Sequence, residues 1–419
     1  MRRYAKCEKR INNIGHFQRN NADNKSDSST FTYKTSKKQL TFSLLCDKLI
    51  LLEVIITVII CDCHYRSAIT AIRSFFALGE KTVAVTTDKY NNPPSFSSSC
   101  VSEKYTLPSN EGEYKNALLK LCASFDKPIL FPVGKFSLEI ISENSTEFSE
   151  VARFCVPSAT MLDSLNNKKW VKEQALKCEV KVPCLYQLES VDKFPVVVKP
   201  YYGEAFSLKA SERYRIVHNR EELSEAYLHF KKYDDSPMIE EFVQGQGIGV
   251  SVMFDNDSNP LTVFCHKRII EYPVDGGPSA YLTTFFDKAL IDSTVNFFKS
   301  ISFKGFAMAE YKDTENGYVL LEVNPRIWGS FPATLIAESN FIKAYINACN
   351  CKSEYSPKYN HGCRVKFSRG LIMAALSYVK RVKLIKAFKS VCILLNPFIK
   401  DATFSVRDLI CSLKDFFRR

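Results

Sequence analysis

The chain has 419 residues, 46% of them hydrophobic, so it can bury two or three cores and is neither fibrous nor disordered as a whole. Its formal net charge of +12 is concentrated at the ends, because residues 1–40 carry +7 and residues 360–419 carry +10. The residues between them carry −5, so the charge does not indicate a nucleic-acid-binding body. We expect basic tails around a mildly acidic core.

The fifteen cysteines are scattered, and none shows the paired CxxC or CxxC with HxxxH spacing of a zinc site. Two CxC pairs, Cys61/Cys63 and Cys349/Cys351, lie inside or beside apolar segments. Free cysteine is among the most buried residue types. We therefore expect reduced, buried thiols and a reducing, cytoplasmic compartment.

Residues 1–45 are expected to form a disordered basic extension, because stretches such as NNADNKSDSST cannot bury a core. The apolar run over residues 44–60 includes Asp47, Lys48 and Glu53, each costly at the centre of a bilayer. Its uninterrupted part, VIITVII, has only the length of a strand. A strand is the preferred interpretation, and a membrane span or signal anchor is the alternative.

The residues after Val54 predict a βαβ unit: the β-prone VIITVII, the helix-length SAITAIRSFFALGEK and the strand TVAVTT. A helix, EYKNALLKLCASF, and a strand, PILFPV, extend the pattern into a doubly wound sheet with parallel strands. The first link, CDCHYRS, is not a glycine-rich GxGxxG, so dinucleotide binding is not indicated. His64 and Arg66 stand where such sheets form crevices. We interpret them as solvated loop residues, since position is the only argument for a site.

Lysines mark the next segment. DSLNNKKWVKEQALK predicts one helix over about residues 162–177, with Lys168 and Lys169 in its middle. FPVVVKP predicts an apolar strand that ends at Lys199, whose charge must be paired or desolvated, and a polyphosphate is a natural partner. The alternative is a lysine that reaches back to solvent.

Two further segments carry polar groups. SPMIEEFVQGQGIGVSVMFD predicts a strand, or alternatively a hairpin whose glycines need positive φ. VFCHKRIIEYPVDGGPSAYLTT places Lys267 and Arg268 on opposite faces of another strand, before the glycine-rich loop at residues 276–279. We favour Arg268 as the site residue and assign His266 no role. A closing helix is expected over residues 334–348.

The segment over residues 307–326, AMAEYKDTENGYVLLEVNPR, predicts a hairpin. Glu322, Asn324 and Arg326 are spaced by two and share one strand face, and Glu310 can lie opposite them on the partner strand. Two carboxylates and an amide oxygen suit Mg²⁺ bridging phosphate oxygens, beside a guanidinium for developing negative charge. A solvent-facing polar edge is the alternative, because short patterns recur by chance.

The ordered motifs resemble the ATP-grasp superfamily of carboxylate-amine ligase type, including the ATP-binding domain of the carbamoyl phosphate synthase large chain. VVVKP, EEFV, KR with GGPS, and LEVNPR followed by WGSFPATLIAESN carry the resemblance. It implies that Glu310, Glu322 and Asn324 hold Mg²⁺, or Mn²⁺, on the phosphates of ATP. It also implies that Arg326 stabilises the transferring group and that Arg268 faces the phosphates and the acceptor.

The resemblance further implies that Lys199 and Lys169, which we prefer to Lys168, contact phosphate. The resemblance also places Glu240, Glu241 and Val243 along the adenine of ATP. Two departures stand out. The lid loop YYGEAFSLK has one glycine, Gly203, with Ala205 and Ser207 as small companions. Gly247 stands where many relatives have a glutamate for the ribose, and Gln246 is the candidate replacement.

The implied fold is mixed α/β and α+β, with a doubly wound pre-ATP-grasp domain over residues 46–160. An ATP-grasp domain follows over residues 161–355, with a mobile lid at about 195–242, and a basic helical tail over 356–419. The implied activity is phosphorylation of a small-molecule carboxylate to an acyl phosphate and its transfer to an amine. A catalytically inactive nucleotide-binding protein with a regulatory or membrane-surface role is the alternative, and no nucleic-acid partner is expected.

The tail GLIMAALSYVKRVKLIKAFKSVCILL predicts a basic amphipathic helix. Tyr378, Val382, Ile385 and Phe388 recur at helical spacing among lysines and an arginine. Contact with an anionic membrane is one interpretation. A helix packed on the body with a solvated basic face is the interpretation that we prefer.

Overall fold

The structure is a computed structural model that describes residues 55–201, 212–274 and 276–418. The described residues all fall in one unit, Ile55–Arg419. The domain boundaries that the sequence predicts at residues 160 and 355 stay predictions. The predicted N-terminal extension and the loop with Gly203, Ala205 and Ser207 lie outside the described residues. No helix of the described part is long and apolar enough to cross a membrane.

The N-terminal sheet is parallel, with strand order β3-β2-β1-β4. Its elements are β1 (Thr57–Ile60), α3 (Arg66–Ala77), β2 (Lys81–Thr87), η1 (Pro94–Ser97), β3 (Glu103–Leu107), α4 (Glu111–Ala123) and β4 (Ile129–Phe131). The predicted βαβ unit is thereby confirmed. The sequence analysis missed β3, because this edge strand alternates half-buried and exposed residues and has no apolar run.

Two expectations for this region are wrong. His64 is buried, and its ring stacks on Tyr90 with centroids 3.6 Å apart, so it is no solvated loop residue. Burial, together with the nearby Arg418, lowers the pKa of His64 to about 4. Arg66 donates from Nε to the buried Asp415 at 3.2 Å. Both residues therefore join the sheet to the C-terminal segment.

The predicted helix over residues 162–177 is two helices, α7 (Ala159–Asn166) and α8 (Lys168–Lys177). They follow α5 (Lys135–Glu143) and α6 (Ser145–Val151). Asn167 breaks the run because its Oδ1 accepts from the amides of Lys169 and Trp170 and caps α8. Asn167, which the sequence analysis placed inside one helix, thus starts a second helix.

A second sheet, with strand order β5-β8-β6-β7, is antiparallel. Its elements are β5 (Leu185–Tyr186), η2 (Leu188–Ser190), β6 (Val196–Lys199), β7 (Arg215–Val217), α9 (Arg220–Phe230) and β8 (Met238–Glu241). Its small core contains Val196, Val198 and Phe230. The sequence analysis predicted one strand over SPMIEEFVQGQGIGVSVMFD, and this prediction is wrong. The segment forms two strands, of which β8 belongs to this sheet and the next belongs to the large sheet. This also excludes the hairpin alternative.

The largest sheet has strand order β13-β12-β9-β10-β11-β14-β15. Its strands are β9 (Gln246–Phe254), β10 (Pro260–Glu271), β11 (Ser279–Thr284), β12 (Gly305–Thr314), β13 (Gly317–Asn324), β14 (Arg364–Lys366) and β15 (Lys400–Asp401). The hairpin β12–β13 confirms the predicted one, and it turns at Gly317, whose φ of +101° favours glycine. Phe131 of β4, Phe306 of β12 and a helical Tyr345 pack ring to ring, which joins this sheet to the N-terminal one.

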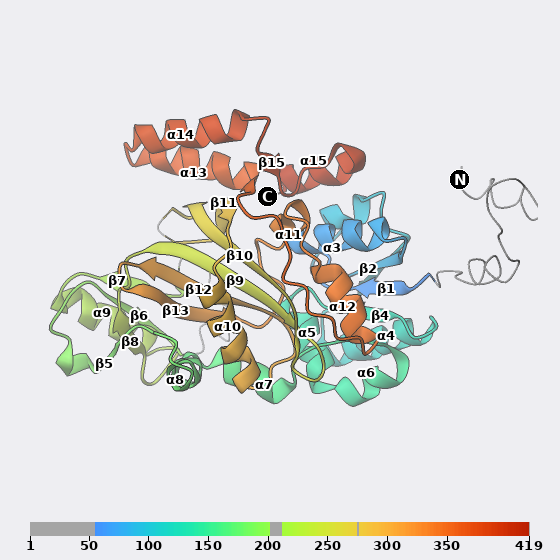
Figure 1. Cartoon of the computed structure of the whole chain (residues 1–419), viewed down its shortest axis with the longest axis horizontal. Coiled ribbons are helices and arrows are strands. Elements are labelled where there is room, and N and C mark those ends of the chain that lie inside the picture. The colour runs from blue at the N-terminus through green and yellow to red at the C-terminus, as the bar shows by residue number, and fades with distance from the viewer. Residues whose placement is uncertain (1–54, 202–211, 275, 419) are drawn as a thin grey trace, which may run out of the picture. The chain divides into compact units, whose positions relative to one another are not determined.

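The remaining helices are α10 (Lys288–Ser300), α11 (Pro332–Ile336), α12 (Phe341–Cys349), α13 (Ser368–Lys380), α14 (Leu384–Leu395), η4 (Val406–Asp408) and α15 (Leu409–Phe417). The closing helix predicted over residues 334–348 is two helices, since Glu338 has a φ of +56° between α11 and α12. The tail also bends at Val382, with φ of +58°, so α13 and α14 form a helical hairpin. In Figure 1, α14 lies on the side of α13 away from the large sheet.

The described cysteines are free thiols, and seven of them are buried. Cys184, Cys351 and Cys392 are exposed, so the expectation of burial is wrong for these three. Burial raises the pKa of the Cys122 and Cys265 thiols to about 12. These two thiols therefore act as small apolar core groups.

Candidate active site

A cavity of about 420 Å³ lies between the second sheet and the large sheet. Strands β6, β7 and β8 contribute one wall, and β10, β12 and β13 contribute the other. The loop at residues 276–279 and the segment after β13 complete the lining. The charged residues in the lining are Lys168, Lys199, Arg213, Glu240, Glu241, Arg268, Glu271, Glu310, Lys312, Glu322 and Arg326. Charges of both signs therefore meet in one cavity.

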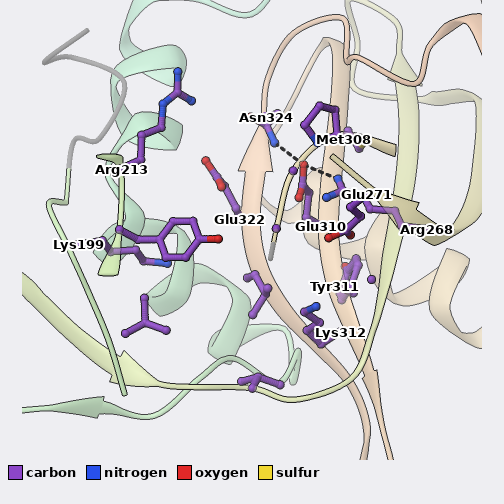
Figure 2. Close-up of a pocket in the computed structure, with 18 of the residues that line it drawn as sticks. Lys199, Arg213, Arg268, Glu271, Met308, Glu310, Tyr311, Lys312, Glu322 and Asn324 are labelled. Atoms are coloured by element: carbon purple, nitrogen blue, oxygen red, sulfur yellow. Dashed lines mark hydrogen bonds and ion pairs between the residues drawn. The ribbon is translucent and has the colours of Figure 1, made fainter. Parts of the chain in front are cut away.

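The predicted acidic group forms on the β12–β13 hairpin. Glu310 is paired directly with Glu322 across the two strands, so both carboxylates lie at one level of the hairpin. Asn324 donates from Nδ2 to Oε1 of Glu310 at 3.2 Å, and Figure 2 shows these side chains together. Arg326, just beyond the end of β13, also lines the cavity. The structure thus brings together all four residues of the predicted hairpin motif.

Arg268 occupies the cavity side of β10, as predicted from strand alternation. Its Nη2 lies 2.7 Å from Oε1 of Glu310, and its side chain is 14% exposed. Its Nε is buried and has no hydrogen-bond partner among the residues that the structure describes. Lys267 faces the other way and pairs with Asp313 at 3.3 Å. A buried guanidinium with an unused donor, beside two carboxylates, is a ready site for an anionic ligand.

Lys199 ends β6 with its side chain 11% exposed, so it does not reach back to bulk solvent. Its Nζ is paired with Oε1 of the buried Glu240. Lys172 of α8 approaches the other oxygen, Oε2, at 2.9 Å, as an ion pair without hydrogen-bond geometry. Burial alone would raise the pKa of Glu240, but the two ammonium groups outweigh it and lower that pKa. The carboxylate is therefore charged and holds Lys199 at the cavity edge.

The structure favours Lys168 over Lys169, the lysine that the sequence analysis preferred. Lys169 is exposed and does not line the cavity, whereas Lys168 lines it and donates from Nζ to the carbonyl of Pro200 at 3.4 Å. The cause is helical geometry: Lys168 and Lys172 are four residues apart and share the inner face of α8. Lys169 is turned by about 100° from that face. The capping role of Asn167 fixes this orientation.

Glu240, Glu241 and Val243 all line the cavity, as expected. Gln246 does not line it, because its amide donates to the carbonyl of Arg268 instead. The proposed replacement of a ribose glutamate by Gln246 is therefore wrong. A side-chain carbon on Gly247 would lie 3.0 Å from Oε1 of Glu271, so the carboxylate of Glu271 occupies that space.

Sequence reasoning missed several cavity residues, chiefly Arg213, Tyr214, Phe242, Glu271, Met308, Lys312, Leu321 and Trp328. Glu271 was detectable in part, since it lies three residues after Arg268, just before the glycine-rich loop. Burial raises its pKa, and Arg268 opposes that rise. Trp328 is fully buried, and its Nε1 lacks a partner in the described structure. Nothing in its local sequence signalled this.

His266 stays outside the cavity lining, in agreement with the absence of an assigned role. It is fully buried, and its Nε2 lies 3.2 Å from the hydroxyl of Ser330. Burial and the nearby Arg268 lower its pKa to about 3. The imidazole is therefore neutral and fills space behind Gly249.

Residues 166–330 match the family described as the ATP-grasp domain. D-alanine–D-alanine ligase of Aquifex aeolicus (strain VF5) is 31% identical over 140 residues, which cover 32% of this chain and 46% of that ligase. The chain spans less than half the length of the curated relatives it matches.

Solved structures give the same fold. A biotin carboxylase complex from Campylobacter jejuni matches with a TM-score of 0.58 at 16% identity, over 74% of either chain. An L-amino acid ligase from Bacillus licheniformis matches with a TM-score of 0.53 at 17% identity, over 72% of this chain and 75% of that one. The chain thus carries an ATP-grasp domain preceded by an α/β region, which confirms the fold and the superfamily resemblance.

Proposed function

We propose that the protein is an ATP-dependent ligase that phosphorylates a substrate carboxylate and transfers the acyl group to an amine. The observation that carries this proposal is the convergence of Glu310, Glu322 and Asn324 with Arg268 and Arg326 in one cavity. The cavity also contains Lys199, whose charge is held in place by a buried carboxylate. Anion-binding and cation-binding groups side by side suit a metal-nucleotide complex.

The residues fit Mg²⁺ bound together with a nucleotide. Within the described ranges, no group of three or more His, Cys, Asp or Glu side chains is placed to hold a metal by itself. Two carboxylates and an amide oxygen leave further positions for phosphate and water oxygens, which Mg²⁺ prefers to a complete protein cage. When bound, the ion would neutralise charge on the phosphate oxygens. Glu310, Glu322 and Asn324 would hold it.

The remaining cavity residues have complementary roles in this proposal. Lys199 and Lys168 place ammonium groups where the phosphates of ATP would lie. Arg268, which pairs with Glu310, and Arg326, which lines the same cavity, would stabilise the negative charge that develops during phosphoryl transfer. The Glu240 carboxylate acts through Lys199, as a positioning group. Glu241 and Val243 would lie along the adenine.

A non-catalytic nucleotide-binding protein is the second candidate, because Gly247 supplies no carboxylate for a ribose. The position of Glu271 argues against it, since its carboxylate fills the space beside Gly247. The second candidate predicts ATP binding without turnover. The ligase predicts turnover that depends on an acceptor.

We expect ADP and phosphate release from Mg·ATP to rise when the right carboxylate and amine are both present. The measurement is release of both products by the full-length protein with pooled amino acids, peptides and small carboxylates. A rise of roughly tenfold or more over the acceptor-free rate would support the ligase, because productive positioning of two substrates accelerates a reaction by far more than that. ATP binding with no release in any pool would favour the second candidate.

We expect the neighbouring lysines Lys168 and Lys169 to differ sharply. Lys168→Met should raise the KM for ATP roughly 10- to 100-fold, because it removes a charged contact worth about 1.5–3 kcal/mol. Lys169→Met is the matched control, and it should leave KM unchanged because Lys169 is exposed and outside the cavity. Steady-state kinetics at varied ATP distinguish them. A larger effect at Lys169 would contradict the geometry of α8.

A further inference from the structure

The α13–α14 hairpin presents an apolar face that no other described residue covers. Ile385, Phe388 and Leu395 of α14 are 86%, 71% and 74% exposed. Val382 in the bend and Phe398 after the helix are 81% and 93% exposed. Isolated exposed apolar residues are common, but a contiguous group of this kind marks an interaction surface.

The exposed residues of α14 follow the helical period. Leu384, Ile385, Phe388, Val391, Cys392 and Leu395 fall on one face of the helix. The small residues Ala387 and Ser390 are buried on a different face, where α14 packs on α13 (Figure 1). The half-buried Ile393 and Leu394 of α14 also pack against a core cluster of the body. The side of α14 that carries the bulky apolar stripe stays exposed.

Lysines border this face. At 3.6 residues per turn, Lys389 lies at the edge of the apolar stripe of α14. Lys386 lies further round the helix, with its Nζ 5.9 Å from the ring centre of Tyr378, and both lysines are exposed. Lys383 stands at the start of the helix. The whole hairpin, residues 368–395, has six Lys or Arg and no Asp or Glu.

The acids that follow the hairpin are engaged internally. Asp401 accepts from the amide of Ser368 at 2.9 Å, Asp408 pairs with Arg73 at 2.9 Å, and Asp415 pairs with Arg66. Asp408 and Asp415 are also buried. They do not neutralise the lysines of α14, so the charge around the apolar stripe is positive.

We propose that the α13–α14 hairpin docks the protein on an anionic lipid surface, with α14 lying in the plane of the interface. Apolar side chains would enter the boundary between headgroups and acyl chains, and the flanking lysines would contact anionic headgroups through long aliphatic stems. A second copy of the chain fits poorly, because it would bring two positive faces together. This proposal is independent of the proposed ligase activity.

The docking hairpin is attached firmly to the catalytic body. Helix α13 packs on β11, whose first residue, Ser279, lines the cavity. Lys366 of β14 donates from Nζ to the carbonyls of Leu394 and Asn396 at 2.7 and 2.8 Å, which fixes the end of α14 to the large sheet. Docking would therefore hold the cavity at a defined place near the lipid surface.

The test is co-sedimentation of the full-length protein with phosphatidylcholine vesicles, with and without phosphatidylglycerol. We expect binding only to the anionic vesicles, with weakening at higher salt. Lys386→Glu with Lys389→Glu should weaken it at least 25-fold, at roughly fivefold for each lysine charge removed. Ile385→Glu with Phe388→Glu should abolish it. Because these residues are exposed, the variants should fold and keep ATP binding.

The matched controls lie on exposed helix faces elsewhere. Leu228→Glu in α9 and Lys120→Glu in α4 change the same kinds of side chain and should leave vesicle binding unchanged. Equal binding to both vesicle types, or binding that survives both pairs of α14 substitutions, overturns the proposal. Self-association that Phe388→Glu abolishes, without vesicle binding, assigns the face to a second copy and also overturns it.

Discussion

Glu322→Gln should lower the rate of acceptor-dependent ADP release on the order of 10³-fold, as the loss of a preorganised charge-stabilising group does. The substitution keeps the shape and removes the negative charge directly opposite Glu310. With one carboxylate left, the hairpin would no longer balance the charge of a divalent ion beside Arg268 and Arg326. The measurement is kcat for ADP release at saturating Mg·ATP and acceptor.

The control for this substitution is Glu315→Gln in the turn of the same hairpin. Glu315 is exposed and does not line the cavity, so its kcat should stay within about twofold of the wild type. Thermal unfolding of both variants should match that of the wild type, since Glu322 is a half-exposed strand residue. A Glu322→Gln protein that turns over at the wild-type rate would remove this carboxylate from the proposed metal site.

Glu240→Gln should reduce the free energy of unfolding by about 3 kcal/mol, the scale of breaking a buried ion pair by removing one partner. Glu240 is 3% exposed and lies between Lys172 and Lys199, which are 3% and 9% exposed. The amide cannot neutralise two buried ammonium groups. Urea unfolding measures the loss. Lys172→Met added to this variant should restore part of the stability, because it removes one uncompensated charge.

The adjacent Glu241 provides the control for Glu240. It is exposed, and its Oε2 accepts from the amide of Cys184 at 3.2 Å. Glu241→Gln keeps an acceptor at that place and should cost less than about 1 kcal/mol. If the two substitutions cost the same, the buried pair does not stabilise the fold as argued.

Glu240 also makes the free energy of unfolding depend on pH. The pKa of Glu240 is lowered in the folded state, so the unfolded chain binds its proton first as the pH falls. The stabilisation is therefore complete above the ordinary glutamate pKa, roughly 4.3, and is lost as the pH falls through the lowered value. Glu240→Gln should flatten this part of the stability curve, which serves as a second readout of the same prediction.

Local patterns were enough for much of the site. Strand alternation placed Glu322 and Asn324 on one face, and the short turn at Gly317 brought Glu310 opposite them. The same rule separated Arg268 from Lys267. These predictions succeeded because they depend on neighbours a few residues apart, whose relative orientation the backbone period determines.

Local patterns failed where a distant group or a cap decided the outcome. Lys169 looked equivalent to Lys168 until the cap at Asn167 set the rotation of α8. Lys172 gave no signal, because its role depends on Glu240, which is far along the chain. His64 looked solvated, but Tyr90 and the C-terminal segment cover it. For Lys172 and His64, burial was created by segments far away in the sequence.

The sequence by itself determined the α/β character of the N-terminal region, the β12–β13 hairpin with its acidic face, and the superfamily resemblance, because residue type and short spacing specify these directly. Only the tertiary structure decided which lysine enters the cavity, that Glu271 takes the space beside Gly247, and that α13 and α14 fold into a hairpin with an uncovered apolar face. These features depend on which surfaces pack together over long range, and that packing is a property of the whole chain.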